Sequence, residues 1–367
     1  MRRLLLFNSS NDLALATGTH EYIAPKSVAK MEKELATLPA WWGEEGDAVI
    51  VGSSEDAATA SEFFAQHNKK ILFTSDEEGY DALCKRAGHN FIPCPWGWSK
   101  ATAERFLKFG VPIPLIPDNN SLERIRSLSS REFAADYIKE LLAEAKEQGL
   151  SDMLVGSKMR FIHSLDELEI TERTIFKSPW SSSGRGVFSA DSLNAPSIRE
   201  KLTGFIKRQG GFIADKLYNK ILDFALEYNI STDGEVTFLG FSVFVAGENG
   251  YYGYNIVTSQ ADLRDMIISK GCNEDMLNWL IETHRRLLHH GLAHKYSGPV
   301  GIDLLLANEG NGITIHPCIE INLRMNMGIL AICVNNSGED NRMLVPYRSN
   351  GFTAEVKEGR LIIGYNR

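Results

Sequence analysis

Short apolar runs alternate with amphipathic segments along the first third of the chain. Strand-like runs lie at residues 4–7, 47–52 and 70–73. Segments with apolar residues at helical spacing follow them, at 25–38, 57–67 and 80–87. Strand–helix alternation on this scale predicts a parallel sheet with helices covering its faces.

Prolines interrupt this alternation, and we predict a domain boundary there. The cluster consists of Pro93, Pro95, Pro112, Pro114 and Pro117. Residues 1–115 would form an N-terminal α/β domain, and residues 116–367 a second domain. In the second domain the pattern predicts helices at 129–148 and 276–290, and strands at 174–177, 212–214, 224–230, 301–306 and 313–321. The last two strands flank the turn at 309–312, which is typical of a hairpin.

Composition and charge narrow the class of protein. Hydrophobic residues make up 43% and charged residues 23% of the 367 residues, as in ordinary globular proteins. The net charge of −8 argues against a protein that coats duplex nucleic acid or binds membranes through a polybasic surface. No apolar run is long enough to span a bilayer, and the five cysteines form no CxxC pair. We therefore expect a soluble cytoplasmic protein with no nucleic-acid or membrane partner.

A polar loop follows the predicted strand that ends at Lys177. It contains several serines and the glycines Gly184 and Gly186. Glycines let a backbone approach a phosphate closely, and consecutive N–H groups can form an anion-binding nest. The loop matches neither the Walker pattern nor the GxGxxG fingerprint. By itself, it fits a flexible hairpin tip at least as well as a phosphate-binding loop.

Three polar residues alternate with apolar ones near residue 320. In a strand, Glu320, Asn322 and Arg324 would project from the same side. Carboxylate and amide oxygens are the ligands that Mg²⁺ prefers, and an arginine one step further suits a terminal phosphate. The alternative is a half-exposed strand whose polar residues simply face water.

A single carboxylate, Asp303, interrupts the apolar run at 300–306. If this strand pairs with the strand that carries Glu320, Asp303 can face Glu320 and complete a metal site. A buried aspartate without a partner would be costly. We therefore favour metal binding by Asp303, Glu320 and Asn322 over a structural salt bridge.

Together these motifs resemble the ATP-grasp superfamily. The resemblance runs over roughly residues 128–328 and rests on Lys177 with the loop 181–186, then Asp303, then Glu320-x-Asn322-x-Arg324. It implies an α/β fold in which a parallel α/β domain precedes an α+β ATP-grasp domain. That domain would have a small mobile middle subdomain at about 160–220 and a central and C-terminal subdomain at about 221–367. Leu323 stands where relatives have proline, and the loop has few glycines, which indicates a divergent member.

The resemblance also implies roles for individual residues. Nucleotide contacts would come from Arg131, Lys177, Ser181, Ser182, Ser183, Gly184, Arg185, Gly186, the adenine hinge Asp215, Lys216 and Leu217, and the ribose-binding Asp223. Asp303, Glu320 and Asn322 would hold two Mg²⁺ ions, for which Mn²⁺ could substitute. Arg324 would face the γ-phosphate and an acyl phosphate, and with Lys177 it would offset the developing charge. Arg131 could equally be a solvated arginine at a helix start.

The activity implied is that of an ATP- and Mg²⁺-dependent ligase of the carboxylate–amine type. A substrate carboxylate would attack the γ-phosphate, and an amine or a similar nucleophile would then displace phosphate from the acyl phosphate. The substrates could be small molecules or peptides, and the sequence identifies no general base and no oligomeric state. The alternatives are a phosphotransferase on the same fold and a non-catalytic nucleotide-binding protein.

One polar segment outside these motifs follows the first predicted strand. Residues 8–12 read Asn-Ser-Ser-Asn-Asp. Polar groups at the carboxyl end of a parallel strand often contact a substrate. They can equally cap the next helix, here through Asn11 or Asp12. The sequence does not favour substrate contact over helix capping for these residues.

Overall fold

The computed structural model describes residues 2–181, 186–246, 252–310, 312–336 and 341–366. The chain forms two compact units. The first unit contains residues 1–125, 254–257 and 324–367, and the second contains 126–253 and 258–323. This division differs from the predicted one at 115/116, because the last 44 residues, 324–367, group with the N-terminal unit.

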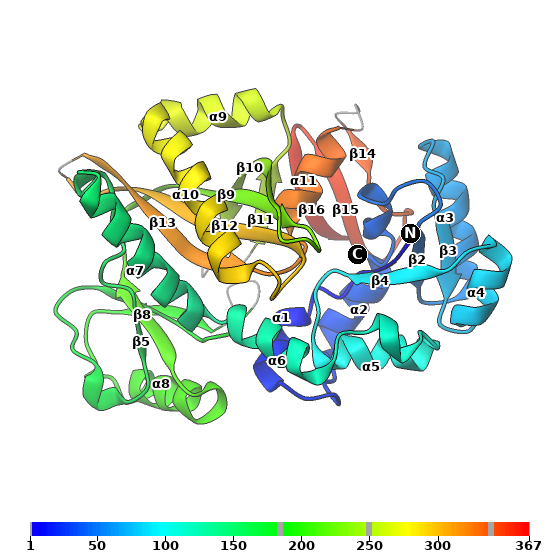
Figure 1. Ribbon diagram of the computed structural model, residues 1–367, viewed down its shortest axis with the longest axis horizontal. Helices are drawn as coiled ribbons and strands as arrows, with labels where there is room; N and C mark the ends of the chain where they lie inside the picture. The colour runs from blue at the N-terminus through cyan, green and yellow to red at the C-terminus, as the bar shows by residue number, and fades with distance from the viewer. Residues whose placement is uncertain (1, 182–185, 247–251, 311, 337–340, 367) are drawn as a thin grey trace. The chain divides into compact units, whose positions relative to one another are not determined.

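A parallel four-stranded sheet forms the core of the first unit (Figure 1). Its strand order is β3-β2-β1-β4. The elements of this part are β1 (Arg2–Leu6), α1 (Asn11–Thr17), α2 (Lys26–Glu34), β2 (Ala48–Val51), α3 (Ser54–Gln66), β3 (Leu72–Ser75), α4 (Tyr80–Ala87), β4 (Phe91–Pro95), α5 (Lys100–Phe109) and α6 (Asn119–Leu128). Apart from the two 3₁₀ helices, Leu38–Trp41 and Ile113–Leu115, strands and helices alternate here, and the predicted parallel sheet is confirmed. The strand β4 and the helices α1, α5 and α6 are additional to the predicted elements.

The first two prolines of the predicted boundary lie inside a strand. Pro93 and Pro95 belong to β4, where Pro93 is paired with Leu4 of β1. Proline cannot donate to a strand ladder, so it is tolerated on edge strands. The strand order places β4 at the edge of the sheet. These prolines therefore reflect an edge position rather than a break between domains.

The C-terminal segment completes the first unit. Its elements are α11 (Met327–Asn335), β14 (Arg342–Met343), β15 (Gly351–Lys357) and β16 (Arg360–Asn366), and β16 pairs antiparallel with β15 and with β11 (Tyr252–Ile256). Leu330 and Leu361 are buried in the same apolar cluster as Leu5 and Val49 of the parallel sheet. Burial of this shared apolar surface explains why residues far apart in sequence form one unit.

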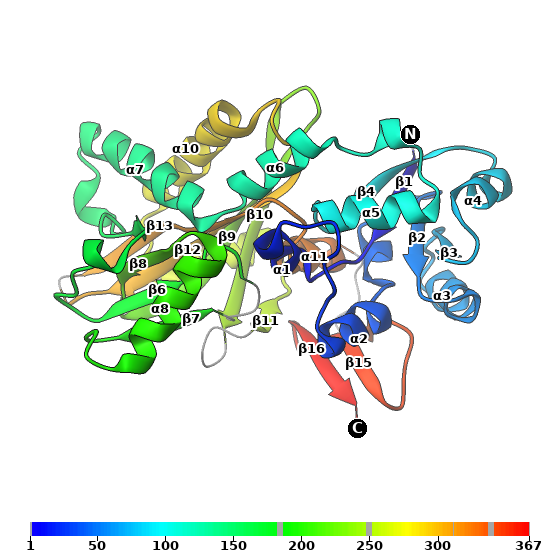
Figure 2. The ribbon, with the colours of Figure 1, turned by 90° about the horizontal axis from the view of Figure 1, so that it is seen from below.

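The second unit contains two antiparallel sheets. The smaller sheet has four strands in the order β5-β8-β6-β7. Of the larger, eight-stranded sheet, the strands β13-β12-β9-β10 belong to this unit. Helix α8 packs on the smaller sheet, and α10 packs on the larger one (Figures 1 and 2). The elements are α7 (Arg131–Glu147), β5 (Arg160–Ile162), β6 (Thr174–Lys177), β7 (Val187–Ala190), α8 (Pro196–Gln209), β8 (Phe212–Lys216), β9 (Lys220–Ile230), β10 (Val236–Ala246), α9 (Gln260–Ser269), α10 (Glu274–Leu292), β12 (Gly298–Asn308) and β13 (Ile313–Asn322).

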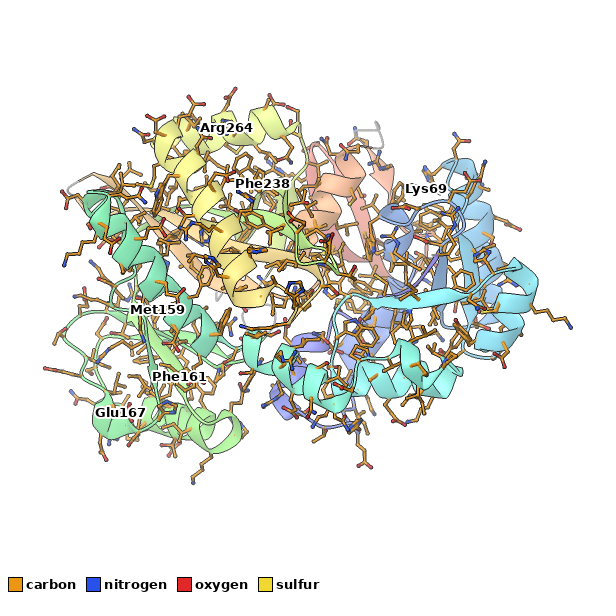
Figure 3. All side chains as sticks on the ribbon, viewed as in Figure 1. Lys69, Met159, Phe161, Glu167, Phe238 and Arg264 are labelled. Carbon is orange, nitrogen blue, oxygen red and sulfur yellow. The ribbon has the colours of Figure 1, made fainter. Side chains whose placement is uncertain are left out.

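The larger sheet has one face covered by helices. The Tyr228 hydroxyl of β9 donates to the backbone oxygen of Ile281 in α10 at 3.0 Å. The ring of Phe238 (Figure 3) packs against Tyr228 and Phe241, with centroids 5.3 and 5.2 Å apart. Alternate residues of a strand point to opposite faces. Neighbours in sequence of these core residues, such as Glu227, therefore point to the other face.

A buried histidine predicts how the stability of the second unit depends on pH. His284 of α10 has its Nδ1 2.9 Å from the Tyr137 hydroxyl, and burial lowers its pKa to about 3. In the unfolded chain the imidazole takes up a proton below about pH 6.5, whereas in the folded protein it stays neutral. The free energy of unfolding is therefore lower by about 2 kcal/mol at pH 5 than at pH 7. Urea unfolding at the two pH values should show a smaller loss for His284→Gln. An equal loss in both proteins would contradict this assignment.

In the described part of the chain, no helix combines the length and the apolar character needed to cross a membrane. All five cysteines are free thiols.

Candidate functional site

A bulged hairpin brings the three predicted metal ligands to one face of the larger sheet. Asp303 of β12 lies directly opposite Glu320 of β13. Asn322 follows on the same side of β13, and its Nδ2 is 3.3 Å from Oδ2 of Asp303. The pairing of the two strands shifts between Asp303 and Leu305. The three residues therefore form a compact group of oxygen-bearing side chains.

Lys177 occupies the end of β6 and is almost fully buried, with 7% of its surface exposed. Burial lowers the pKa of its ammonium group, and the negative charges of Asp215, Glu320 and Asp303 act in the opposite direction. The side chain is thus a buried cation whose charge is offset by nearby carboxylates, as the burial of a charge requires.

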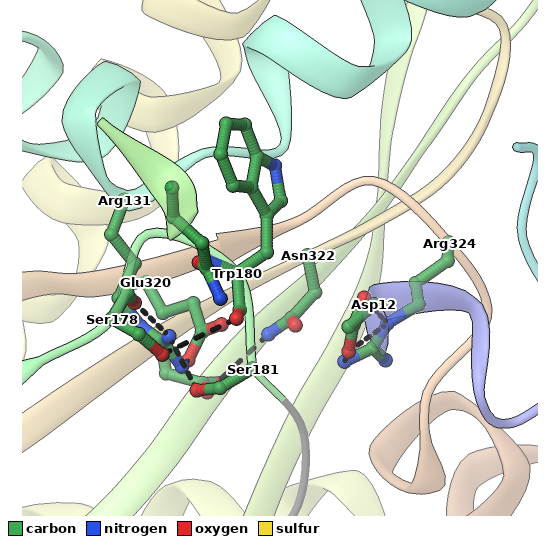
Figure 4. Close-up of polar contacts among 10 residues, drawn as sticks. Asp12, Arg131, Ser178, Trp180, Ser181, Glu320, Asn322 and Arg324 are labelled. Atoms are coloured by element: carbon green, nitrogen blue, oxygen red, sulfur yellow. Dashed lines mark hydrogen bonds and ion pairs between the residues drawn. The ribbon is translucent and has the colours of Figure 1, made fainter. Parts of the chain in front are cut away.

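Arg131 connects the loop after β6 with the strand that carries Glu320 (Figure 4). Its Nη1 donates to the backbone oxygen of Ser178 and to Oγ of Ser181, both at 2.7 Å, and its Nη2 donates to Oε2 of Glu320 at 2.7 Å. The guanidinium is buried, so the alternative of a solvated arginine at a helix start is wrong. In this arrangement Arg131 neutralises Glu320 and holds the start of the loop.

The described part of the loop is fixed at both ends. The backbone N–H of Ser178 donates to the oxygen of Gly186 at 2.9 Å. Gly186 has φ +74°, and a Cβ there would lie 2.4 Å from Oγ of Ser178, so only glycine fits. Trp180 donates from Nε1 to the oxygen of Arg126 at 2.9 Å. The predicted nucleotide contacts Ser182, Ser183, Gly184 and Arg185 lie outside the described residues.

The predicted adenine hinge has other partners within the protein. Oδ2 of Asp215 lies 3.0 Å from Nε2 of His316, and both side chains are buried. The backbone N–H of Leu217 donates to the oxygen of Arg173 at 2.9 Å, and the Lys216 ammonium pairs with Glu309. Sequence reasoning missed His316, whose only signal was a histidine inside an apolar strand. The role of Asp215, Lys216 and Leu217 toward adenine stays a prediction.

The predicted ribose contact, Asp223, lies on β9. Its Oδ2 accepts from the Lys220 ammonium at 2.6 Å, and burial raises the pKa of its carboxyl group. Asp223 and Ala225 share one side of the strand, and Ala225 is paired with Asp303. Asp223 therefore projects from the face of the sheet that carries the three oxygen-bearing residues.

The spacing predicts that Arg324 lies on the same strand as Glu320 and Asn322. This prediction is wrong. β13 ends at Asn322, and Arg324 belongs to the first unit. There its guanidinium is bound side-on by Asp12: Nε lies 2.9 and 3.1 Å from the two carboxylate oxygens, and Nη2 lies 2.7 Å from Oδ2. A pairing between residues 312 positions apart leaves no local signal in the sequence.

The polar segment 8–12 does not cap its helix in the predicted way. α1 begins at Asn11, its N-cap residue is Ser10, and no side chain makes a capping hydrogen bond. Capping by Asn11 or Asp12 is therefore wrong as an explanation of these residues.

The residues present fit a divalent cation with oxygen ligands. In the described ranges, no three His, Cys, Asp or Glu side chains are grouped so that they could hold a metal. The predicted set differs in kind, because it combines two carboxylates with one amide, Asn322. Mg²⁺ takes oxygen ligands and is usually bound by one or two carboxylates together with substrate phosphates. Metal binding by these residues stays a prediction.

Comparisons with known proteins are informative at the level of structure. No protein-family model and no curated protein sequence matches the chain. Biotin carboxylase from Campylobacter jejuni is similar in structure with a TM-score of 0.52 at 11% identity, over 100% of this chain and 88% of that one. Pyruvate carboxylase from Rhizobium etli gives a TM-score of 0.52 at 14% identity over 91% of this chain, which spans only 27% of that protein. The chain therefore has the fold of the ATP-grasp superfamily, as its motifs predict.

Proposed function

We propose that this protein is an ATP- and Mg²⁺-dependent ligase that joins a carboxylate to an amine through an acyl phosphate. The observation that carries the proposal is the placement of Asp303 opposite Glu320, with the buried cations Lys177 and Arg131 at the same site. The fold supports it, since the similar biotin carboxylase structure is a complex with an ATP analogue.

Each group of residues has a proposed task. Asp303, Glu320 and Asn322 hold divalent ions, which supply charge neutralisation for the phosphate oxygens when bound. Lys177, Arg131, Ser181 and the loop that ends at Gly186 bind the phosphates. The hinge at 215–217 and Asp223 bind adenine and ribose, and Arg324 faces the transferred phosphoryl group.

The chain's own contribution is mainly electrostatic. Lys177 and Arg131 are fixed in place before the reaction, so little reorganisation is needed when negative charge develops on the phosphoryl group. Arg131 neutralises Glu320 through a hydrogen bond from Nη2. We propose that this one hydrogen bond from Nη2 passes to a substrate phosphate, while the bonds from Nη1 to Ser178 and Ser181 keep the guanidinium in place.

A screen for trapped acyl phosphates tests this function. The full chain is incubated with ATP, Mg²⁺, hydroxylamine and a panel of amino acids and small carboxylic acids, and ADP and hydroxamate are measured. We expect Mg²⁺-dependent formation of both with at least one acid. A stable phosphorylated product in place of a hydroxamate would indicate a phosphotransferase, and no ADP with any acid would indicate a nucleotide-binding protein without catalysis.

A further inference from the structure

We propose that Asn11 and Asp12 form a subsite for the primary ammonium group of the acceptor substrate, next to Arg324. This inference rests on the proposed ligase function and names the class of nucleophile and the residues that hold it. All of the residues concerned belong to the first unit.

The strand order places this subsite where open parallel sheets bind ligands. The chain runs from β1 through β2 to β3 in one direction and then returns to the opposite side of β1 for β4. Ligands bind in such sheets beyond the carboxyl ends of the strands, at the point where the order reverses. Asn11 and Asp12 follow β1, and Gly97 follows β4. The main chain of Met325 is held there too, since its N–H donates to the oxygen of Trp96 at 2.8 Å.

Asn11 carries a buried amide without a protein partner. Only 2% of the residue is exposed, and neither its Oδ1 nor its Nδ2 has a hydrogen-bond partner among the described residues. Asn8 in the same segment differs, because its Nδ2 donates to Gly97 at 2.8 Å and to Thr102 at 2.9 Å. A buried amide that lacks a partner costs about 1–3 kcal/mol of stability. Asn8 thus has a structural role, whereas the cost at Asn11 is explained by a ligand.

Gly97 keeps the space beside this amide free of a side chain. A Cβ at position 97 would lie 2.4 Å from Nδ2 of Asn11 and 3.1 Å from Cβ of Arg324. The same glycine therefore borders both the Asn11 amide and Arg324. Any larger residue would push the two apart, so Gly97 makes their close approach possible.

The charges around Asn11 select an ammonium group. Asp12 supplies carboxylate oxygens, and Asn11 supplies an amide oxygen. A primary ammonium has three N–H donors and no acceptor, which matches oxygens of this kind. Arg324 offsets the Asp12 charge, so the preference for an ammonium over a carboxylate depends on a phosphate taking up the Arg324 charge.

The ion pair between Asp12 and Arg324 couples the ammonium subsite to the role proposed for Arg324. Arg324 is proposed to face the acyl phosphate, and Asp12 is bound to the same guanidinium at 2.7 Å. When a phosphate shares the Arg324 charge, the Asp12 charge becomes available to an ammonium. The bound ammonium must lose a proton to water before its nitrogen bonds to the acyl carbon, and phosphate then leaves with the electrons of the broken carbon–oxygen bond.

Competition between two nucleophiles tests the subsite. Ammonium chloride and hydroxylamine are offered together to the full chain with ATP, Mg²⁺ and the acid found in the screen, and the ratio of carboxamide to hydroxamate is measured. Hydroxylamine is neutral near pH 7 and makes no use of an ammonium subsite. The ratio depends neither on the rate of acyl phosphate formation nor on the fraction of folded enzyme.

We expect Asn11→Leu to lower this ratio at least about tenfold, as the loss of a hydrogen bond to a charged group predicts. Asn11→Ala, which adds no bulk, should do the same, and Asn90→Leu on the exposed loop before β4 should match the wild type. Equal ratios in wild type and Asn11→Leu, or no carboxamide from the wild type, would overturn the subsite. Failure to form hydroxamate in the wild type would instead overturn the ligase function.

The melting temperature gives a readout that does not depend on any reaction. Leucine has nearly the shape of asparagine and needs no hydrogen bonds. If Asn11 lacks a protein partner, Asn11→Leu should raise Tm by about 2 °C or more. A fall of similar size would show that Asn11 is a structural amide, and it would overturn the subsite whatever the reaction is.

Discussion

Replacing Glu320 by alanine is expected to abolish ATP turnover while leaving the fold intact. Glu320 is opposite Asp303 in the hairpin, and together with Asn322 it supplies the proposed oxygen ligands. Loss of a ligand to an ion that stabilises the transferred phosphoryl group removes several kcal/mol, so we expect kcat to fall at least about a hundredfold. The measurement is the rate of Mg²⁺-dependent ADP formation with the best acid from the screen.

The control variant is Glu282→Ala, which also removes a glutamate with an arginine partner in the second unit. Glu282 pairs with Arg285 at 2.9 Å on the exposed side of α10. It should keep wild-type turnover, and circular dichroism should show both variants folded. Turnover near the wild-type rate in Glu320→Ala would refute the metal assignment.

Lys177→Ala is expected to weaken nucleotide binding by about 10- to 100-fold, the range for a hydrogen bond between charged groups. Lys177 is buried at the end of β6, and its charge is surrounded by Asp215, Glu320 and Asp303. Titration calorimetry with Mg²⁺ and a non-hydrolysable ATP analogue measures the change in Kd.

Two further variants separate charge from packing. Lys177→Met keeps the volume of the buried side chain and should weaken binding as much as the alanine variant. Lys139→Ala removes an exposed lysine that pairs with Asp136 on α7, and its Kd should equal that of the wild type. Unchanged affinity in both Lys177 variants would remove this residue from the nucleotide site.

The placement of Asp303 and Glu320 on one face was predictable from periodicity, but the register that pairs them was not. Strand alternation and the hairpin turn suffice to place Asp303 and Glu320 on one face. Counted back from the turn, the pairing of Asn308 with Ile313 would put Cys318 opposite Asp303, and the irregularity between Asp303 and Leu305 brings Glu320 there instead. Pro317 lies in this part of β13. Prolines in sheets occur at edges and bulges, so Pro317 is the residue that could have indicated the shift.

Contacts between distant segments could not be predicted. The ion pairs of Arg131 with Glu320 and of Arg324 with Asp12 join residues 189 and 312 positions apart. Such partners are set by how the sheets and helices pack, and no local pattern encodes them. The grouping of residues 324–367 with the first unit has the same origin, because it depends on a shared apolar core.

The position of a bound metal ion tests the central claim most directly. Crystals of the full chain with Mn²⁺ and a non-hydrolysable ATP analogue would locate the ion by anomalous scattering. We predict density bounded by the side-chain oxygens of Asp303, Glu320 and Asn322, with the phosphates of the nucleotide completing the coordination. Nucleotide bound with manganese elsewhere, or with these three side chains turned away from it, would contradict the account.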